Sequence, residues 1–350
     1  MTRSVPRWRY DVTDLVRQAR DGQARAVARL ITLVESNDPV LPRIATELAP
    51  HTGHALVVGL TGAPGVGKST TTSELVRVLR ERGRRIGVLA VDPSSPFTGG
   101  AILGDRVRMQ EHATDPGVYI RSMSSRGHLG GLAAATPAAV RVLDGVGCDV
   151  VLIETVGVGQ AEVEVAGLAD TTVVLLAPGM GDAIQAVKAG ILEIADVFVV
   201  NKADRDGADA TVRDLNGMIG LGTRAPGQWR PPVVRAVATS GDGIDGLVTA
   251  IERHHDWLAG HGELTTRRAR RAAAEVEAIA LGALRNRISA LRGGTRLAGL
   301  AAEVLAGRLD PYAAAGRLIA DLVDLADPAG LADPADPGRG PVGRGPAISG

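Results

Sequence analysis

Residues that could bind phosphate groups form one short run early in the chain, Gly62-Ala63-Pro64-Gly65-Val66-Gly67-Lys68-Ser69, with Thr70 directly after it. The run fits the P-loop pattern, in which backbone N–H groups surround the phosphates, the lysine reaches the β- and γ-phosphates and the serine hydroxyl binds Mg²⁺. An apolar stretch at residues 56–60 precedes it and a helical stretch at residues 69–80 follows, as the motif requires. We therefore expect a nucleoside triphosphate to bind at residues 62–70, with Lys68 acting in catalysis.

A second run could distinguish guanine from adenine. It is Asn201-Lys202-Ala203-Asp204, directly after the apolar stretch at residues 197–200. A carboxylate at Asp204 can accept hydrogen bonds from the N1–H and the exocyclic amino group of guanine, whereas adenine presents an acceptor at N1. Asn201 would connect this run to the P-loop, and the stem of Lys202 would cover the base. We therefore predict that the chain binds GTP rather than ATP.

The next apolar stretch, at residues 233–237, is followed closely by Thr239-Ser240-Gly241. Backbone N–H groups of these residues could support the guanine base from the other side. A plain turn at the end of a strand explains the same residues equally well, so both interpretations stay open.

Acidic residues stand at the ends of two further apolar stretches, where they could bind Mg²⁺ or position the attacking water. Glu154 ends the stretch at residues 150–153 and begins a glycine-containing segment that closes with Gln160 near the expected γ-phosphate. Asp92 ends the stretch at residues 86–91, and Asp105 lies in the loop that follows. We take Ser69, Asp92, Asp105 and Glu154 as the candidate metal ligands. A solvent-exposed loop position is the alternative for Asp105.

Lysine is rare in this chain, which contains 39 basic residues of which only three are lysines. Two of the three, Lys68 and Lys202, fall in the nucleotide motifs. A compact ammonium group can do what a guanidinium fork cannot, so the position of the third, Lys188, also points to a function.

Lys188 lies in the segment at residues 181–190, which has the features of a hinged helix start. Asp182 and Gln185 have the spacing of a helix N-cap and the residue that returns its hydrogen bond. Residues 178–181, Pro-Gly-Met-Gly, give the segment a flexible entry. We predict a mobile segment that senses the nucleotide, in which Gln185 and Lys188 contribute to catalysis. An ordinary surface lysine is the alternative.

The elements that would position these residues follow an alternating pattern of short apolar stretches and helical stretches. Continuous aliphatic stretches are typical of strands covered on both faces, and their alternation with helices indicates parallel pairing. We predict an α/β fold with a mostly parallel sheet of the P-loop NTPase type, flanked by helices. The expected strands lie at residues 56–60, 86–91, 150–153, 172–176, 197–200 and 233–237.

Helical spacing of apolar residues extends beyond the expected sheet at both ends. At residues 11–36 it predicts an N-terminal helical extension that closes at Asn37-Asp38-Pro39. At residues 266–325 it leaves an apolar stripe that must pack on something. We expect the organisation to be an N-terminal helical extension (1–54), a P-loop GTPase domain (55–261), a C-terminal helical dimerisation arm (262–326) and a disordered Gly/Pro-rich tail (327–350).

Composition excludes several classes of protein. With 39 basic and 39 acidic side chains, the chain gives no electrostatic reason to bind nucleic acid or an anionic membrane. One cysteine, Cys148, excludes a disulfide framework, and no apolar run is long enough to span a membrane. We expect a soluble cytoplasmic protein. We interpret the histidines at 51, 54, 254, 255 and 261 as scattered linker residues rather than a metal site.

The motifs together resemble the G-protein chaperones of adenosylcobalamin-dependent methylmalonyl-CoA mutase, the MeaB/ArgK-like family. The resemblance covers roughly residues 10–325, and the chain departs from it at Ala183, where the family pattern has an acidic residue. The segments that carry it are residues 62–70, 91–95, 154–160, 181–193 and 201–204.

The resemblance implies a SIMIBI-class P-loop GTPase that forms a homodimer through its C-terminal arm and hydrolyses GTP slowly until its mutase responds. It implies GTP or GDP with Mg²⁺ as ligands, and a cobalamin-dependent acyl-CoA mutase as partner. The implied function is gated loading of cobalamin and rescue of the inactivated mutase, with residues 181–188 as the switch that communicates with the mutase.

Two other functions remain as alternatives. A transport-associated ATPase or kinase is the first, because related sequences have carried an arginine/ornithine transport label; Asn201 to Asp204 argues against ATP. A metal-insertion GTPase for urease or hydrogenase maturation is the second, and the chain lacks the Cys/His cluster that it would need. Nucleotide selectivity tests the first and metal binding the second.

Overall fold

The computed structural model describes residues 11–92, 109–124, 135–155, 161–179, 192–221, 225, 227–292 and 295–324 of the 350-residue chain. The chain divides into two compact units, residues 1–272 and 273–350. The first unit holds the sheet and the predicted nucleotide motifs. Within the described ranges, no helix combines the length and the apolar character that a membrane span requires.

The strands are β1 (Leu56–Thr61), β2 (Ile86–Asp92), β3 (Val118–Ser124), β4 (Val150–Thr155), β5 (Thr171–Leu176), β6 (Val197–Val200) and β7 (Val233–Arg235). The helices of the first unit are α1 (Val12–Arg20), α2 (Ala24–Glu35), α3 (Leu41–Leu48), η1 (Ala49–His51), α4 (Lys68–Glu81), η2 (Gln110–His112), α6 (Thr136–Gly145), α7 (Ala161–Leu168), α9 (Leu192–Ile194), α10 (Ala208–Leu221) and α11 (Ile244–Gly260). The last three helices are α12 (Glu263–Arg292), which begins in the first unit, α13 (Thr295–Leu305) and α14 (Pro311–Asp324).

The strands form one seven-stranded sheet in the order β3-β2-β4-β1-β5-β6-β7, and every neighbouring pair is parallel. The predicted α/β fold is therefore confirmed. Strands β2, β3 and β4 lie on one side of β1 in the sheet, and after β4 the chain crosses to β5 on the other side of β1. Open α/β sheets bind ligands at the carboxyl ends of strands where this reversal occurs, so the fold directs attention to the loops that follow β1 and β4.

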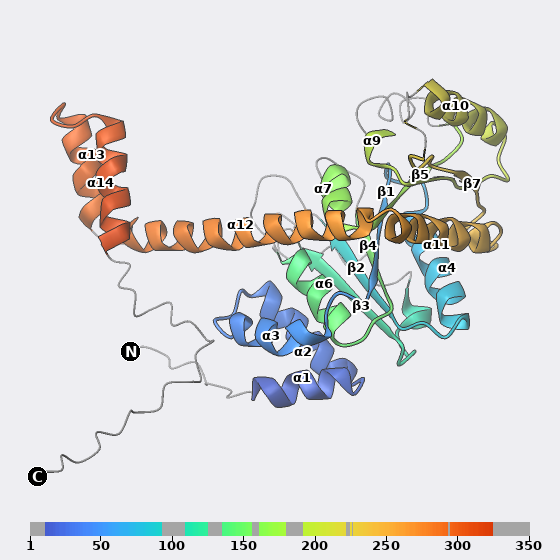
Figure 1. The fold of residues 1–350 in the computed structure, drawn as a ribbon, viewed down its shortest axis with the longest axis horizontal. Coiled ribbons are helices and arrows are strands. Elements are labelled where there is room, and N and C mark those ends of the chain that lie inside the picture. The colour runs from blue at the N-terminus through green and yellow to red at the C-terminus, as the bar shows by residue number, and fades with distance from the viewer. Residues whose placement is uncertain are drawn as a thin grey trace, which may run out of the picture. The chain divides into compact units, whose positions relative to one another are not determined.

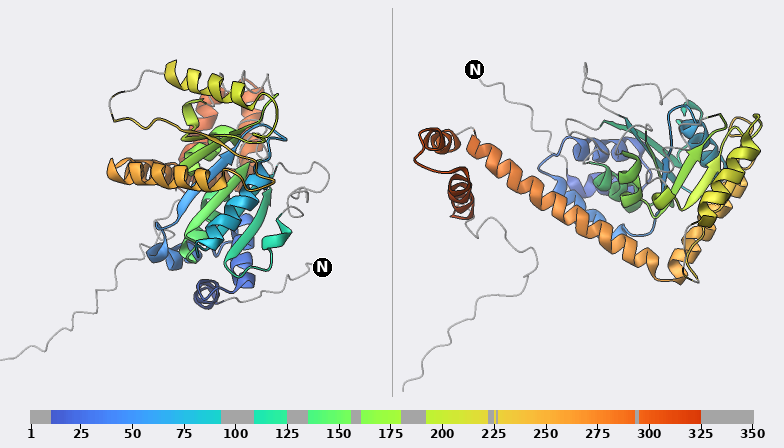
Figure 2. Two further views of the ribbon diagram at one scale, coloured as in Figure 1. Left: turned by 90° about the vertical axis from the view of Figure 1, so that its right-hand side faces the viewer. Right: turned by 90° about the horizontal axis from the view of Figure 1, so that it is seen from above.

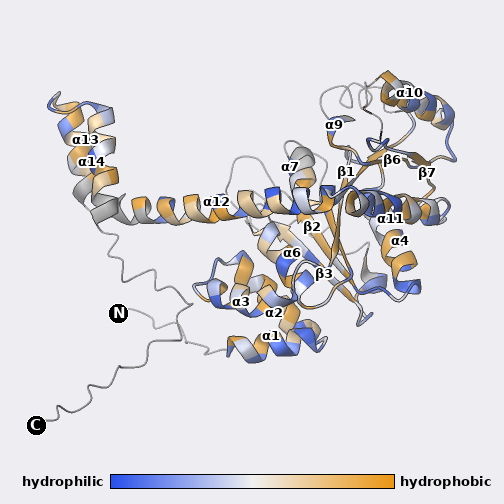
Figure 3. Ribbon diagram, viewed as in Figure 1, coloured by the Kyte–Doolittle hydropathy of each residue, from blue (hydrophilic) through white to orange (hydrophobic). Residues whose placement is uncertain are grey.

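Helices cover both faces of the sheet (Figures 1 and 2). The central strands are mainly hydrophobic (Figure 3), because alternate residues of a strand point to opposite faces and both faces are buried. Helices α4 and α11 pack against one face, which includes Val58, Val173 and Val199. The N-terminal helices and α6 cover the opposite face near β2 and β4, and α10 covers that side of β6 around Phe198.

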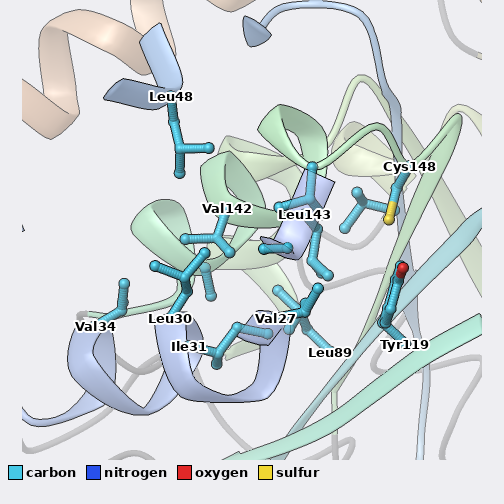
Figure 4. Close-up of a cluster of buried hydrophobic side chains, with 14 of the residues drawn as sticks. Val27, Leu30, Ile31, Val34, Leu48, Leu89, Tyr119, Val142, Leu143 and Cys148 are labelled. Carbon is cyan, nitrogen blue, oxygen red and sulfur yellow. The ribbon is translucent and has the colours of Figure 1, made fainter. Parts of the chain in front are cut away.

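The N-terminal helices form part of the core of the first unit. The predicted apolar stripe is buried, including Val27, Leu30, Ile31 and Val34 of α2, which pack against α3, α6 and the sheet (Figure 4). The helical region also continues past the predicted end at Asn37-Asp38-Pro39 with α3. Pro42 lies in the first turn of α3, where proline is tolerated because the N–H groups of that turn have no intrahelical partner.

The second half of α12 and the helices after it expose large apolar side chains. The exposed fractions are 68% for Val276, 66% for Ile279 and 59% for Ile319. Bands of hydrophobic residues are visible along α12 and α14 (Figure 3). Soluble monomers seldom leave such side chains uncovered when they recur at helical spacing.

The first turns of α12 are bound to the amino ends of two central strands by arginine–aspartate pairs. Asp170 and Asp196 directly precede β5 and β6 and are buried. Arg267 donates to both carboxylate oxygens of Asp196, each at 2.9 Å. Arg268 and Arg271 donate to Asp170 at 2.8 Å and 3.2 Å. The start of α12 is thus fixed to the edge of the sheet that lies opposite the predicted nucleotide site.

His254 also belongs to this buried region. It is fully buried in α11; its Nδ1 lies 2.8 Å from Thr171 Oγ1 and its Nε2 lies 3.2 Å from Asp196 Oδ1. His255 lies beside it in the same helix. The prediction of linker positions is therefore wrong for these two histidines. The helical spacing of residues 244–258 carried the signal for a core position, because it places His254 on the same face as Leu247 and Ile251.

Candidate functional site

The predicted P-loop connects β1 to α4 at the carboxyl edge of the sheet, next to β4 and β5. Gly62 has a φ of +140°, and a Cβ atom there would lie only 2.3 Å from the carbonyl oxygen of Leu175 on β5. Glycine therefore permits the loop to pass directly over β5. Ala63 packs against the core, whereas Pro64 and Gly65 are exposed at the tip of the loop.

Helix α4 begins within the last part of the loop motif, Gly67-Lys68-Ser69. Gly67 is the N-cap, with a left-handed φ of 97°. Its missing side chain matters because a Cβ atom would lie 2.3 Å from the Nδ2 atom of Asn201. The N-terminus of α4 thus points its N–H groups into the loop, which is the arrangement that binds phosphate in P-loops. Thr70 follows in the first turn and is half-buried.

Lys68 and Ser69 are both buried at this helix start. The Lys68 ammonium donates hydrogen bonds to the carbonyl oxygens of Gly62 at 2.7 Å and Ala63 at 3.0 Å. It therefore lies inside the curve of the loop, where a phosphate would bring its negative charge. Ser69 Oγ donates to Glu154 Oε1 at 2.5 Å. The structure therefore brings together two of the predicted metal ligands.

The oxygen atoms of Ser69 and Glu154 fit the chemistry of Mg²⁺. This ion takes oxygen ligands, and a protein usually supplies only one or two of them while water and substrate phosphates supply the rest. Glu154 is buried at the end of β4, beside the P-loop strand. A divalent cation there would meet one carboxylate and one hydroxyl next to the expected β- and γ-phosphates.

The guanine motif lies against the P-loop. Asn201 is buried; its Nδ2 donates to the carbonyl oxygen of Val66 at 2.8 Å, and its Oδ1 accepts from the backbone N–H of Ala238 at 3.0 Å. Lys202 has a left-handed φ of 57°, and its Nζ donates to the carbonyl oxygen of Gly65 at 2.7 Å. Asp204 is exposed. The structure thus supports the predicted connection through Asn201 and leaves the Asp204 carboxylate accessible.

The segment after β7 is held next to the same motif. Thr239, Ser240 and Gly241 form a turn closed by a bridge between Val237 and Asp242. Ser240 Oγ donates to Asp242 Oδ2 at 2.7 Å, and Gly241 has a left-handed φ of +80°. The segment is therefore a turn at a strand end, and its connection to Asn201 through Ala238 also places it beside the proposed base-binding residues.

Five predicted site residues remain, of which the structure describes one, Asp92. Asp105, Gln160, Gln185 and Lys188 lie outside the residues that the structure describes. The backbone of Asp92 ends β2 at the same carboxyl edge as Glu154, since β2 and β4 are paired up to Val91 and Thr155.

One arginine of the sheet contacts the N-terminal helices. Arg121 lies within β3 and donates to Glu35 of α2, and to Thr32 Oγ1 at 3.1 Å. Its guanidinium therefore binds the N-terminal helices.

Over the described part of the chain, no group of three or more His, Cys, Asp or Glu side chains is arranged to hold a metal ion.

Sequence reasoning missed two features of the site. The first is the N–H of Ala238, which fixes the Asn201 amide together with Val66. The second is a hydroxyl pair beneath the loop, in which Thr155 Oγ1 donates to Thr61 Oγ1 at 3.2 Å. Both threonines are fully buried at the ends of β4 and β1. Threonine at the end of an apolar stretch was the available signal, because a buried hydroxyl needs a partner.

Replacing Asp204 by asparagine is expected to weaken GDP and GTP binding by about a hundredfold, because two hydrogen bonds from guanine to a carboxylate are lost. The amide of asparagine would also oppose the guanine N1–H with its own donor. Titration calorimetry with GDP, GTP and ATP measures the effect. Asp206→Asn, an exposed carboxylate in the same loop, serves as the matched control. Equal affinity of the unaltered protein for ATP and GTP would contradict the prediction.

Comparison with known proteins shows which family the chain is similar to. The family model for methylmalonyl-CoA mutase-associated GTPase MeaB matches residues 27–292. A putative GTPase of Pyrococcus abyssi is 46% identical over 315 residues, covering 89% of this chain and 97% of the relative. The mouse protein named methylmalonic aciduria type A homolog, mitochondrial, is 39% identical over 264 residues, covering 71% of this chain and 64% of the relative.

A solved structure described as an LAO/AO transport system kinase superposes with a TM-score of 0.66 at 26% identity, covering 89% of this chain and 97% of that chain. The family match begins within α2 and spans α3, the whole sheet and all of α12; α1 precedes it. The chain therefore belongs to the family of methylmalonyl-CoA mutase-associated GTPases, and it is a P-loop GTPase that binds GTP and GDP.

Proposed function

We propose that this GTPase is a chaperone that gates the loading of cobalamin onto an adenosylcobalamin-dependent acyl-CoA mutase of the methylmalonyl-CoA mutase type, and that it protects or reactivates that enzyme. The observation that carries the proposal is the family match over residues 27–292. The name of the mouse relative, which refers to methylmalonic aciduria, supports a client that handles methylmalonyl groups.

Hydrolysis of GTP would take place at the P-loop. The Lys68 ammonium, which lies inside the curve of the loop, would neutralise charge on the β- and γ-phosphates as the bond between them breaks. Ser69 and Glu154 would hold Mg²⁺, with Asp92 and Asp105 as further candidates. When bound, Mg²⁺ would neutralise part of the negative charge of the phosphates. Asn201 would hold residues 201–204 next to the P-loop through its hydrogen bond to the carbonyl oxygen of Val66.

Coupling to the client would depend on the segment at residues 181–188. We propose that Gln160, Gln185 and Lys188 complete the catalytic site only when the mutase stabilises one arrangement of that segment. A partner that binds one conformation more tightly shifts the population toward it, and it does not need residues already poised in the free protein. Intrinsic GTP hydrolysis would then be slow, and the mutase would accelerate it.

The mutase is expected to stimulate GTP turnover in the unaltered chain, and Lys188→Ala is expected to lose that stimulation with little change in GTP affinity. The reason is that the ammonium would act only in the arrangement that the client stabilises. Phosphate release with and without methylmalonyl-CoA mutase is the measurement, with Arg213→Ala on the exposed face of α10 as control. Equal stimulation of both variants would refute the role of Lys188; no stimulation of the unaltered chain would refute the chaperone function.

We further propose that α12 to α14 form a dimerisation arm. Support comes from the exposed Val276 and Ile279 on α12, since most soluble oligomers are symmetric homo-oligomers and a second copy would cover this stripe. Truncation after His261 would remove the apolar stripe together with the arginines that bind Asp170 and Asp196. It should therefore yield a monomer or an aggregating protein. Truncation after Ala326 should leave the oligomeric state unchanged.

Charge on the stripe is expected to convert the dimer to a monomer without disturbing the start of α12. The variant is Val276→Glu combined with Ile279→Glu, because two buried unpaired carboxylates would oppose association. Glu277→Gln, an exposed polar position between them, is the matched control. Light scattering coupled to size exclusion gives the mass, and a monomeric unaltered protein would refute the arm.

A transport-associated kinase or ATPase is the second candidate, favoured by the description of the similar solved structure. It predicts that ATP binds at least as tightly as GTP. The Asp204 titrations distinguish it from the chaperone GTPase.

A further inference from the structure

Two of the three tryptophans of this chain lie next to each other. Aromatic residues make up 2% of the sequence, which has three tryptophans. Two of these, Trp229 and Trp257, have ring centroids 5.9 Å apart, and Trp229 also contacts the buried His254 at 4.8 Å. Their indole N–H groups donate to the backbone carbonyls of Asp196 at 2.7 Å and Gly227 at 3.2 Å. Both rings are therefore fixed in orientation by their edges.

The two rings border a surface cavity of about 220 Å³, lined by Gln228, Trp229, Arg230, Pro232, Ala250, Arg253 and Trp257. One wall is the second half of α11, and the other is the segment that leads into β7. Helix α11 follows β7 and runs back along a parallel sheet, so its second half lies near the amino ends of the strands. The cavity is therefore at the edge of the sheet opposite the P-loop, which follows the carboxyl end of β1.

The charge of the cavity is positive. Arg230 and Arg253 are both exposed on its lining. Among the residues that the structure describes, neither forms an ion pair, and no acidic side chain lines the cavity. Most other arginines of the first unit whose contacts are known bind carboxylates, such as Arg80 to Asp115 at 2.8 Å and Arg82 to Asp245 at 3.0 Å. Arginine forks bind carboxylate and phosphate groups through paired hydrogen bonds.

We propose that this cavity is a second ligand site, which binds a small planar anion: one or two conjugated rings that carry a carboxylate or a phosphate. His261 stacks on the Trp257 ring with centroids 4.7 Å apart, so the uncovered surface of the two half-buried indoles forms an apolar wall. Arg230 and Arg253 offer a place for the acid group. Sites for drug-sized molecules measure about 300–1,000 Å³. The smaller volume here limits the ligand to a fragment of that size, and a complete nucleoside triphosphate does not fit. The site is independent of the nucleotide site and of the proposed chaperone function.

Tryptophan fluorescence tests the proposal directly, because two of the three tryptophans line the site. The full chain is titrated with naphthalene-2-carboxylate and, separately, with naphthyl phosphate, in the presence of saturating GDP so that the P-loop is occupied. Naphthalene-2-carboxamide tests the need for charge, and cyclohexanecarboxylate tests the need for a planar ring. We expect saturable quenching by the two planar anions and none by the other two probes. The ratio of the two affinities shows which acid group the site prefers.

The double variant Arg230→Gln with Arg253→Gln is expected to bind the planar anions at least about tenfold more weakly, since hydrogen bonds to a charged group are lost. Arg213→Gln, an exposed arginine of α10 away from the cavity, should bind them as the unaltered chain does. GDP affinity reports that each variant is folded. Absence of quenching by both planar anions up to millimolar concentration would overturn the proposal, and so would equal affinity in the double variant and in the control.

Discussion

Replacement of Lys68 by alanine should reduce the single-turnover rate of GTP hydrolysis by about a thousandfold, the upper end of what loss of one preorganised charge donor costs an enzyme. The ammonium is buried and is held by the carbonyl oxygens of Gly62 and Ala63. It is therefore already positioned inside the loop and needs little reorganisation when charge develops on the phosphates. Lys68→Arg should be nearly as inactive, because a planar guanidinium is larger than the compact ammonium that the carbonyl oxygens of Gly62 and Ala63 hold at 2.7 Å and 3.0 Å.

A control on the same helix separates this effect from a loss of structure. Arg77 of α4 is partly exposed and pairs with Glu74 and Glu81 on the helix surface. Arg77→Ala should leave the hydrolysis rate within about a factor of two, because exposed ion pairs contribute little. Circular dichroism should be the same for all three variants. Hydrolysis by Lys68→Ala at the rate of Arg77→Ala would show that the loop does not perform the chemistry.

The sheet could be predicted from the sequence wherever strands are buried on both faces. All six expected stretches appear as strands, but β3 was missed. This strand lies at the edge, and Arg121 and Ser122 interrupt its apolar residues. Arg121 satisfies its charge with Glu35 of α2, a partner that no local pattern indicates. Edge strands mix polar and apolar residues because only part of their surface is covered.

The candidate site was predictable to the extent that it is local in sequence. Residues 62–70 and 201–204 have fixed spacing because a phosphate or a base must meet several groups at once, and the structure brings both runs together through Asn201. The arginine pairs at the other edge of the sheet were not predictable. Arginine is so common in this chain that Arg267 and Arg268 carried no signal. Asp170 and Asp196 also resemble ordinary turn residues before a strand.

The arginine–aspartate pairs at the start of α12 are expected to make a large contribution to stability. Asp196→Asn is expected to lower the free energy of unfolding of the first unit by about 3 kcal/mol. Removal of one partner from a buried pair costs about 3–5 kcal/mol, and the lower end applies because the side chain of Arg267 is 33% exposed. Asp196 also accepts from the backbone N–H of Thr172 at 2.8 Å, so its loss weakens the contact between β5, β6 and α12 at one point.

Acid should remove the same stabilisation from the unaltered protein. Burial raises the pKa of Asp196, but hydrogen bonds from His254 and Arg267 outweigh burial and hold this pKa below its ordinary value of 3.8. A carboxylate whose pKa is lower in the folded state stabilises the protein above the unfolded pKa, and this contribution is lost as the pH falls through the folded pKa. The difference in stability between the unaltered chain and Asp196→Asn should therefore be full at neutral pH and shrink as the pH falls below 3.8.

Urea unfolding followed by tryptophan fluorescence can measure both effects, because Trp229 donates to the backbone carbonyl of Asp196 and contacts His254. Asp245→Asn is the matched control: Asp245 also pairs with an arginine, Arg82, but its side chain is 80% exposed, so its loss should cost about 0–1 kcal/mol. Arg267→Gln, alone and with Asp196→Asn, completes a double-mutant cycle that isolates the energy of the pair. If Asp196→Asn costs no more than Asp245→Asn at neutral pH, the attachment of α12 to the sheet does not stabilise the fold.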